Sequence, residues 1–143
     1  MSLLTSLPMP ATLLVCIAIA AVLVYAPFLL VGAARVQTGY DMSAPRTMTD
    51  KMPPYAQRAN WAHQNAFESL TLFAPAALMA YVTGQDSAVA LGAAIAYVTA
   101  RLLYSVFYIA DIPLLRSAMF AIGSVSIFTL FFLSCRTALF LGG

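Results

Sequence analysis

The sequence contains few charged residues for its length. Charged residues make up 8% of its 143 residues, and the net charge is +2 at pH 7. A charge this small, carried by scattered basic residues, does not indicate a protein that binds nucleic acid. Hydrophobic residues account for 62% of the chain, more than the roughly one half that is typical of soluble domains. The composition therefore excludes an ordinary soluble domain and indicates an integral membrane protein.

Cysteine and histidine are also scarce. The two cysteines, Cys16 and Cys135, stand alone in apolar segments with no CxxC pattern. We interpret them as small packing residues of membrane helices, although both are expected near the same membrane face, where a disulfide is also geometrically feasible. His63 is the single histidine and no carboxylate cluster accompanies it, so the sequence predicts no metal site.

The N-terminus lacks the features of a cleaved secretory signal. Residues 1–10 contain no Lys or Arg, so the positively charged region that opens such signals is missing. The apolar run also continues through Val31, which is too long for the core of a signal peptide. We interpret this run as a retained first membrane helix.

Four apolar stretches fill most of the chain, and each is long enough to cross a bilayer. Polar or Gly/Pro-containing connections separate them at about residues 35–54, 84–87 and 111–113. Since the last two connections are short, consecutive helices must be antiparallel neighbours. The sequence therefore predicts one all-α membrane domain over residues 1–143, an up-down four-helix bundle with helices at about residues 10–34, 55–82, 88–110 and 114–138.

The basic residues predict the orientation of these helices. Cytoplasmic connections of membrane proteins carry an excess of Lys and Arg. One side of the predicted bundle has a single candidate, Arg136, and the other side has five, which are Arg35, Arg46, Lys51, Arg58 and Arg116. We therefore expect the first and third connections to face the cytoplasm.

Two opposite charges fall inside the apolar stretches. Glu68 lies ten residues after Arg58, and Arg101 lies ten residues before Asp111, which puts both about 15 Å from the cytoplasmic helix ends. A charge at this depth is costly unless it is paired or faces a polar cavity. Glu68 and Arg101 are therefore expected to pair, either as an ion pair that fixes helix packing or as part of a binding site.

Polar and aromatic residues recur with helical spacing around these charges. Trp61, Asn65 and Glu68 share one face of the second helix, and His63 lies off that face. On the third helix, Arg101 shares a face with three tyrosines. We interpret Tyr97 as an interfacial anchor and assign Tyr104 and Tyr108 to a site, together with Arg35, Arg116 and Ser117. In such a site the arginines would bind carboxylates and Glu68 would bind an ammonium group. The polar and aromatic faces of the two helices therefore predict a small anionic ligand that also carries an amino group.

Residues 58–68, with the sequence RANWAHQNAFE, followed by Phe73, resemble the signature of the MAPEG superfamily, the membrane-associated proteins in eicosanoid and glutathione metabolism. The core of that signature is an Ala-His-x-Asn-x-x-Glu run, which here begins at Ala62. Residues 101–108 and the following Pro113-x-x-Arg116-Ser117 are similar to the second motif of this family. The resemblance covers nearly the whole chain, and the small bacterial members are the most similar branch.

The resemblance implies a homotrimer that holds glutathione between neighbouring subunits near the cytoplasmic face. Arg116, helped by Ser117, would stabilise the glutathione thiolate, because an adjacent cation lowers the pKa of a thiol. By position, the residues that would bind the tripeptide are Arg35, Asn65, Glu68, Arg101, Tyr104 and Tyr108; some family members have His where this chain has Tyr104.

Two positions depart from the glutathione-using members. Gln64 stands where they have Arg, and Trp61 stands where they often have a second Arg.

Our leading hypothesis is a glutathione-dependent transferase or peroxidase that acts on small lipophilic electrophiles from within a bacterial inner membrane. The alternative is a non-catalytic trimeric membrane protein that binds a lipid or a partner subunit. Trp61 and Gln64 favour the alternative, whereas Arg116 with Ser117 favours the enzyme.

Overall fold

Helices account for all the regular secondary structure that we describe. The computed structural model describes residues 9–39 and 41–140. These residues form four long α-helices and one 3-10 helix and contain no strand, as expected for the all-α class. In chain order the elements are α2 (Met9–Thr38), η1 (Pro45–Lys51), α3 (Pro54–Val82), α4 (Ala88–Ile109) and α5 (Pro113–Phe140).

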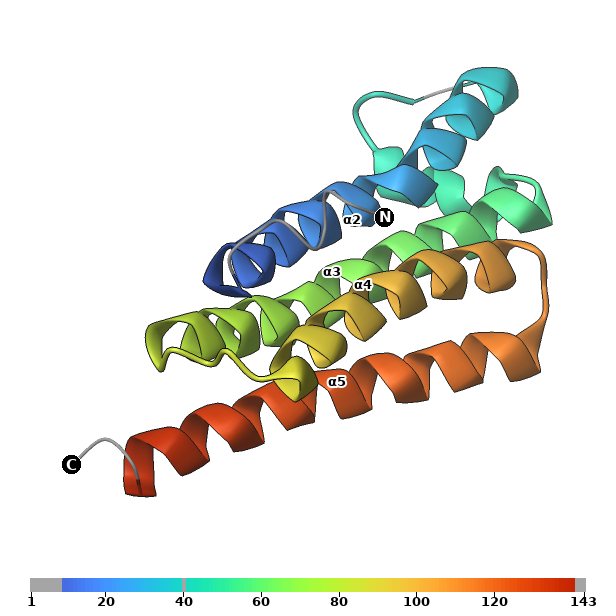
Figure 1. Ribbon diagram of the computed structural model, residues 1–143. Coiled ribbons are helices and arrows are strands. Elements are labelled where there is room, and N and C mark those ends of the chain that lie inside the picture. The colour runs from blue at the N-terminus through green and yellow to red at the C-terminus, as the bar shows by residue number, and fades with distance from the viewer. Residues whose placement is uncertain (1–8, 40, 141–143) are drawn as a thin grey trace.

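The four long helices lie side by side, and each runs in the opposite direction to the one before it (Figure 1). Helix α2 packs mainly against α3, and α5 packs mainly against α4. Helices α3 and α4 therefore lie between α2 and α5 (Figure 1). Because α3 also contacts both α4 and α5, side chains from these three helices can meet in one place.

The helix ends follow from local sequence. Pro54 occupies the first turn of α3, where its missing N–H costs nothing. Ser87 caps α4, since its Oγ accepts a hydrogen bond from the N–H of Ala90 at 3.2 Å. Helix α2 continues four residues beyond the predicted end at residue 34, and the hydroxyl of Thr38 donates to the carbonyl of Ala34 at 2.9 Å.

Part of the polar connection between α2 and α3 forms the short helix η1. Pro45 opens this short helix, and Met48 on η1 is buried. Met52, which follows η1, packs with Val31 and Ala56 in a small apolar cluster between α2 and α3. The methionines thus hold η1 against the two helices that it joins.

The main core is built from alanines and two stacked aromatic rings. Phe73 of α3 and Tyr97 of α4 stack with centroids 3.7 Å apart, and the Tyr97 hydroxyl forms a 2.9 Å hydrogen bond with Ser69. The interpretation of Tyr97 as an interfacial anchor is therefore wrong, because this residue is 1% exposed. A polar partner within the chain satisfies its hydroxyl, so the ring can be buried.

Small side chains let membrane helices approach closely, so the sequence predicts close helix contacts for the small residues of α4, which are Gly92, Ala93, Ala96 and Ala100. Ala100 is buried, as are Ala90 and Ala94, but Gly92 is exposed and no atom lies within 4 Å of the position that its Cβ would occupy. The prediction is wrong for Gly92, which lies on the side of α4 that faces away from the core.

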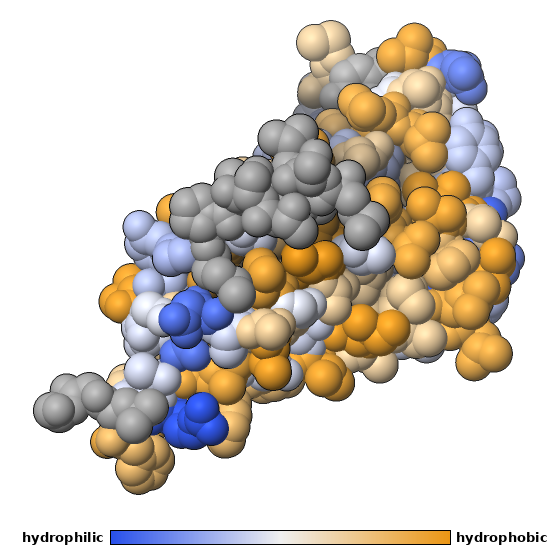
Figure 2. Space-filling model, in the orientation of Figure 1, coloured by the Kyte–Doolittle hydropathy of each residue, from blue (hydrophilic) through white to orange (hydrophobic). Residues whose placement is uncertain are grey.

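In the part of the chain that the structure describes, three helices are long and apolar enough to cross a membrane, namely α2, α4 and α5. Helix α3 is long enough but more polar, because its first half contains a run of charged and amide side chains. Apolar side chains cover much of the face shown in Figure 2, and hydrophilic ones gather towards its ends. Cys16 on α2 and Cys135 on α5 are both free thiols.

Candidate functional site

A small cavity lies where α3, α4 and the first turn of α5 meet. Its volume is about 280 Å³. The residues that line it are Asn65, Tyr104, Tyr108, Arg116, Ser117 and Phe120. All of these except Phe120 were candidate site residues on sequence grounds. Phe120 lies one turn after Arg116 on α5, and no polar or motif pattern in the sequence indicated it.

The guanidinium group of Arg116 stacks on the ring of Tyr108 in this cavity. The guanidinium carbon of Arg116 lies 4.7 Å from the centroid of the Tyr108 ring, a distance at which the ring attracts the cation. Tyr104 packs edge-on against Tyr108, with centroids 5.6 Å apart. The cavity therefore combines one guanidinium and one serine hydroxyl with an aromatic wall, and no carboxylate lines it.

Arg101 lies behind the cavity and does not line it. It is 4% exposed, its Nη2 donates to Oδ1 of Asn65 at 3.0 Å, and its guanidinium lies 4.2 Å from the Tyr104 centroid. A guanidinium can only donate, so the oxygen of the Asn65 amide must face Arg101. The amide nitrogen of Asn65 is then the group left to donate to a ligand.

The expected pairing of Glu68 with Arg101 is wrong. Glu68 is exposed on this chain, and among the described residues no ion pair joins it to Arg101. Asn65, one turn earlier on α3, takes the position facing Arg101. Distance from the helix ends determines the height of each charge along its helix but not the direction of Glu68 around the helix axis.

Arg35 lies apart from these residues, in a second and larger cavity between α2, η1 and α3. The volume of this cavity is about 670 Å³. Two arginines line it, Arg35 from α2 and Arg46 from η1. The other lining residues are Phe28, Pro45, Thr49, Asn60, Trp61, His63 and Gln64. The predicted site residues therefore fall into two groups on one chain, with Arg35 separate from the cavity of Arg116.

Sequence reasoning missed Arg46 and His63 of the second cavity. Nδ1 of His63 lies 2.7 Å from the carbonyl oxygen of Val24, which can only accept, so Nδ1 carries a proton. The His63 ring packs against Phe28, with centroids 4.9 Å apart. The position of His63 inside the Ala-His-x-Asn-x-x-Glu run was the available signal, whereas Arg46 lies in a connection without periodicity.

Trp61 connects the two cavities. It lines the second cavity, and its ring centroid lies 6.4 Å from that of Tyr108 in the first. The Trp61 residue is 44% exposed. Trp61 therefore presents an aromatic surface at the position where the resemblance led us to expect a cation.

Within residues 9–39 and 41–140, no group of three or more His, Cys, Asp or Glu side chains is arranged to hold a metal ion. Two further hollows, of about 450 and 430 Å³, lie between α4 and α5 and are almost entirely apolar. Small residues such as Gly92 and Ala96 line both. No residue that lines either hollow also lines one of the two polar cavities.

Comparison with known proteins assigns the chain to one family. The family model described as the MAPEG family matches residues 12–136, a range that contains every residue of both polar cavities. No curated protein and no solved structure matches the chain.

Proposed function

This chain belongs to the MAPEG family and is an integral membrane protein, and from that premise we propose that it is a glutathione-dependent transferase or peroxidase acting on lipophilic electrophiles. The observation that carries the proposal is the cavity that holds Arg116, Ser117, Tyr108 and Asn65 together. Family membership is consistent with a glutathione-related membrane function, and the cavity supplies groups suited to it.

In this proposal, Arg116 and Ser117 stabilise the thiolate of glutathione. A fixed cation beside a thiol lowers its pKa and raises the reactive fraction at neutral pH. The thiol proton passes to water, the sulfur forms a bond to the electrophilic carbon, and the leaving group departs with the bonding electron pair. With a hydroperoxide, the thiolate instead attacks the peroxide oxygen, the O–O bond breaks, and the alcohol leaves after taking up a proton. The resulting glutathione sulfenic acid then reacts with the thiol of a second glutathione, which forms the disulfide and releases the oxygen as water.

The remaining residues would bind and orient the tripeptide. The amide nitrogen of Asn65, oriented by Arg101, would donate to a carbonyl or carboxylate oxygen of the ligand. Tyr104 and Tyr108 would form one wall, and Glu68 would bind the ammonium group. Arg101 would act through Asn65 and Tyr104 rather than by direct contact, which changes the role that the sequence suggested for it.

We further propose that the site is completed by a neighbouring subunit in a homotrimer. The cavity of about 280 Å³ is slightly smaller than the roughly 300–1,000 Å³ of typical small-molecule sites. Glu68 is exposed on the single chain, and an unpaired charge facing lipid is costly. A neighbouring subunit could bring its second cavity, with Arg35 and Arg46, towards Glu68 and Arg116. This contact would enlarge the site and would also give Glu68 a cationic partner.

The same assembly accounts for the polarity of α3. In an up-down four-helix bundle within a trimer, α3 would face other subunits, and the three apolar helices would face lipid. The basic residues at one end of the helices favour placing the first and third connections in the cytoplasm. We propose that this membrane is a bacterial inner membrane.

A non-catalytic protein that binds a lipid or a partner subunit is the second candidate. Two observations favour it. Gln64 and Trp61 line a polar cavity, and they stand where glutathione-using members have one arginine and often a second. Apolar hollows suited to acyl chains also lie along α4 and α5. The loss of each charged contact would weaken glutathione binding by about 1–3 kcal/mol.

Calorimetric titration of glutathione into the purified protein distinguishes the two candidates. The enzyme proposal predicts saturable binding, with turnover of a chlorinated aromatic acceptor, and loss of turnover in Arg116→Ala. Arg136→Ala is the matched control, because Arg136 is exposed near the far end of α5. Absence of both binding and turnover in the unmodified protein would favour the non-catalytic candidate.

A further inference from the structure

Helices α3 and α4 end in the same backbone turn, but with different residues at its critical position. After α3, the N–H of Gln85 donates to the carbonyl of Ala80 at 2.9 Å, and Gly84 has a φ of +67°. After α4, the N–H of Ile112 donates to the carbonyl of Phe107 at 2.9 Å, and Asp111 has a φ of +60°. This turn normally favours glycine, because a side chain is unfavourable at positive φ.

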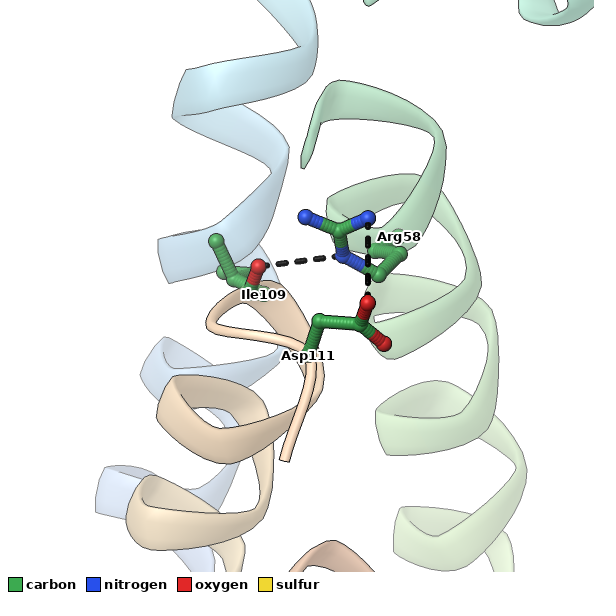
Figure 3. Close-up of polar contacts among 3 residues, drawn as sticks. All are labelled: Arg58, Ile109 and Asp111. Carbon is green, nitrogen blue, oxygen red and sulfur yellow. Dashed lines mark hydrogen bonds and ion pairs between the residues drawn. The ribbon is translucent and has the colours of Figure 1, made fainter. Parts of the chain in front are cut away.

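The aspartate is found where an arginine from another helix reaches the turn. Nε of Arg58, on α3, donates to the carbonyl oxygen of Ile109 at 3.1 Å, and its Nη1 lies 4.0 Å from Oδ2 of Asp111 (Figure 3). The carbonyl of Ile109 is one of those left without an intrahelical partner at the end of α4. A cation there also interacts favourably with the helix dipole. Arg58 thus binds both the helix end and the side chain at positive φ.

The turn held by Arg58 joins the two sides of the candidate site. Tyr108 precedes Asp111 by three residues, and Arg116 follows it in the first turn of α5, where its N–H donates to the carbonyl of Ile112 at 3.0 Å. The stacking of Arg116 on Tyr108 therefore depends on the geometry of this turn. Asn65 lies seven residues after Arg58 on α3, so Arg58 also sets the turn relative to Asn65.

We propose that Arg58 and Asp111 are positioning residues: together they fasten the α4–α5 turn to α3 and so set Arg116 over Tyr108 relative to Asn65. We call this pair of contacts, from Arg58 to Ile109 and to Asp111, the clip. Its effect on catalysis rests on the proposed function, whereas its role in holding the turn against α3 does not. The hydrogen bond from Arg58 to Ile109 carries most of the effect, because the pair with Asp111 is longer and the aspartate is 68% exposed.

The test compares Arg58→Gln with Arg58→Lys and Asp111→Asn. Lysine retains a cation that can donate to Ile109, and asparagine tolerates positive φ while lacking the charge. Because a small misplacement of a catalytic group is costly, Arg58→Gln is expected to lower kcat by roughly 10- to 100-fold, with little change in KM and with the thiolate appearing only at higher pH. Arg58→Lys is expected to restore most of kcat, and Asp111→Asn to lower it by only a few-fold.

A second measurement does not depend on activity. Trp61 is the single tryptophan of the chain, lies one turn after Arg58, and approaches Tyr108, so its emission reports how the end of α4 is held against α3. In Arg58→Gln we expect a changed emission maximum and stronger quenching by iodide, and in Arg58→Lys emission like that of the unmodified protein. Asp111→Asn provides the comparison if Arg58→Gln fails to fold.

The outcomes separate the two proposals. Unchanged Trp61 emission and unchanged kcat in both Arg58→Gln and Asp111→Asn would overturn the clip and leave the proposed function standing. If the unmodified protein shows no turnover and no thiolate, the proposed function fails and the Trp61 measurement alone decides the clip. A Trp61 change in Arg58→Gln that lysine does not reverse would also overturn it, because lysine retains the cation.

Discussion

Replacement of Arg101 by methionine tests how a buried guanidinium is stabilised in this fold. Arg101 is 4% exposed, its Nε is buried without a hydrogen-bond partner, and its contacts are Asn65 and the Tyr104 ring. Its Cδ lies 3.7 Å from the position that a Cβ on Gly123 would take. Methionine retains an apolar stem against Gly123 while removing the charge.

The expected change in stability is small. The hydrogen bond to Asn65 contributes about 0.5–1.5 kcal/mol, and the stacking on Tyr104 contributes about 2 kcal/mol in a desolvated site. The loss of both is offset by relief of the desolvation penalty, which is several kcal/mol for a buried ion. We therefore expect Arg101→Met to change the free energy of unfolding by no more than about 1 kcal/mol, because the two effects nearly cancel.

Glutathione binding is expected to respond more strongly than stability. Without Arg101, the Asn65 amide loses its fixed orientation, and a positive charge behind the cavity is lost. A loss of about 1.4 kcal/mol corresponds to about tenfold weaker binding. Calorimetry and unfolding in mixed detergent–SDS micelles measure the two quantities, with Arg136→Met as the exposed control.

One result would refute this reasoning. Removal of one partner from a buried ion pair destabilises a protein by about 3–5 kcal/mol. A loss of that size in Arg101→Met would mean that a carboxylate pairs with Arg101 in the assembled protein. Glu68 of a neighbouring copy would then be the first candidate.

Two further predictions concern helix α4 and assembly. Ser87→Ala removes the cap on the N–H of Ala90 and is expected to lower the free energy of unfolding by about 1 kcal/mol; an unchanged value in SDS unfolding would contradict the capping role. Glu68→Gln is expected to weaken the trimer if a neighbour's cation pairs with Glu68, and native mass spectrometry would detect a shift towards monomer. A stable monomer or dimer of the unmodified protein would contradict the trimer itself.

The sequence was sufficient to predict which site residues lie together when their grouping depends only on spacing along one helix. Tyr104 and Tyr108 share a face of α4, and Arg116 with Ser117 opens α5, so a short α4–α5 turn brings them to the same end. The structure has these residues in one cavity. Spacing along a helix is fixed by its 3.6-residue period, which is why this grouping was accessible from sequence.

Contacts that depend on helix rotation or on irregular backbone were not accessible. Glu68 and Arg101 have matched depth, yet Asn65 is the residue that bonds to Arg101, and Glu68 is exposed on the surface of the chain. Arg35 lies in another cavity because η1, which sequence patterns did not predict, covers α2 and α3 beside it. The contact of Arg58 with the α4–α5 turn joins residues 51 positions apart, and no periodicity indicates it.

The most direct test of the central claim is the ultraviolet absorbance of glutathione thiolate on the protein at neutral pH, measured alongside calorimetric binding. The account predicts a thiolate signal in the unmodified protein and in Arg136→Ala, and its loss in Arg116→Ala while glutathione still binds. A thiolate signal of equal size in Arg116→Ala would contradict the assigned role of Arg116. Glutathione bound to the unmodified protein with no thiolate signal and no turnover would contradict the claim that this cavity activates the thiol.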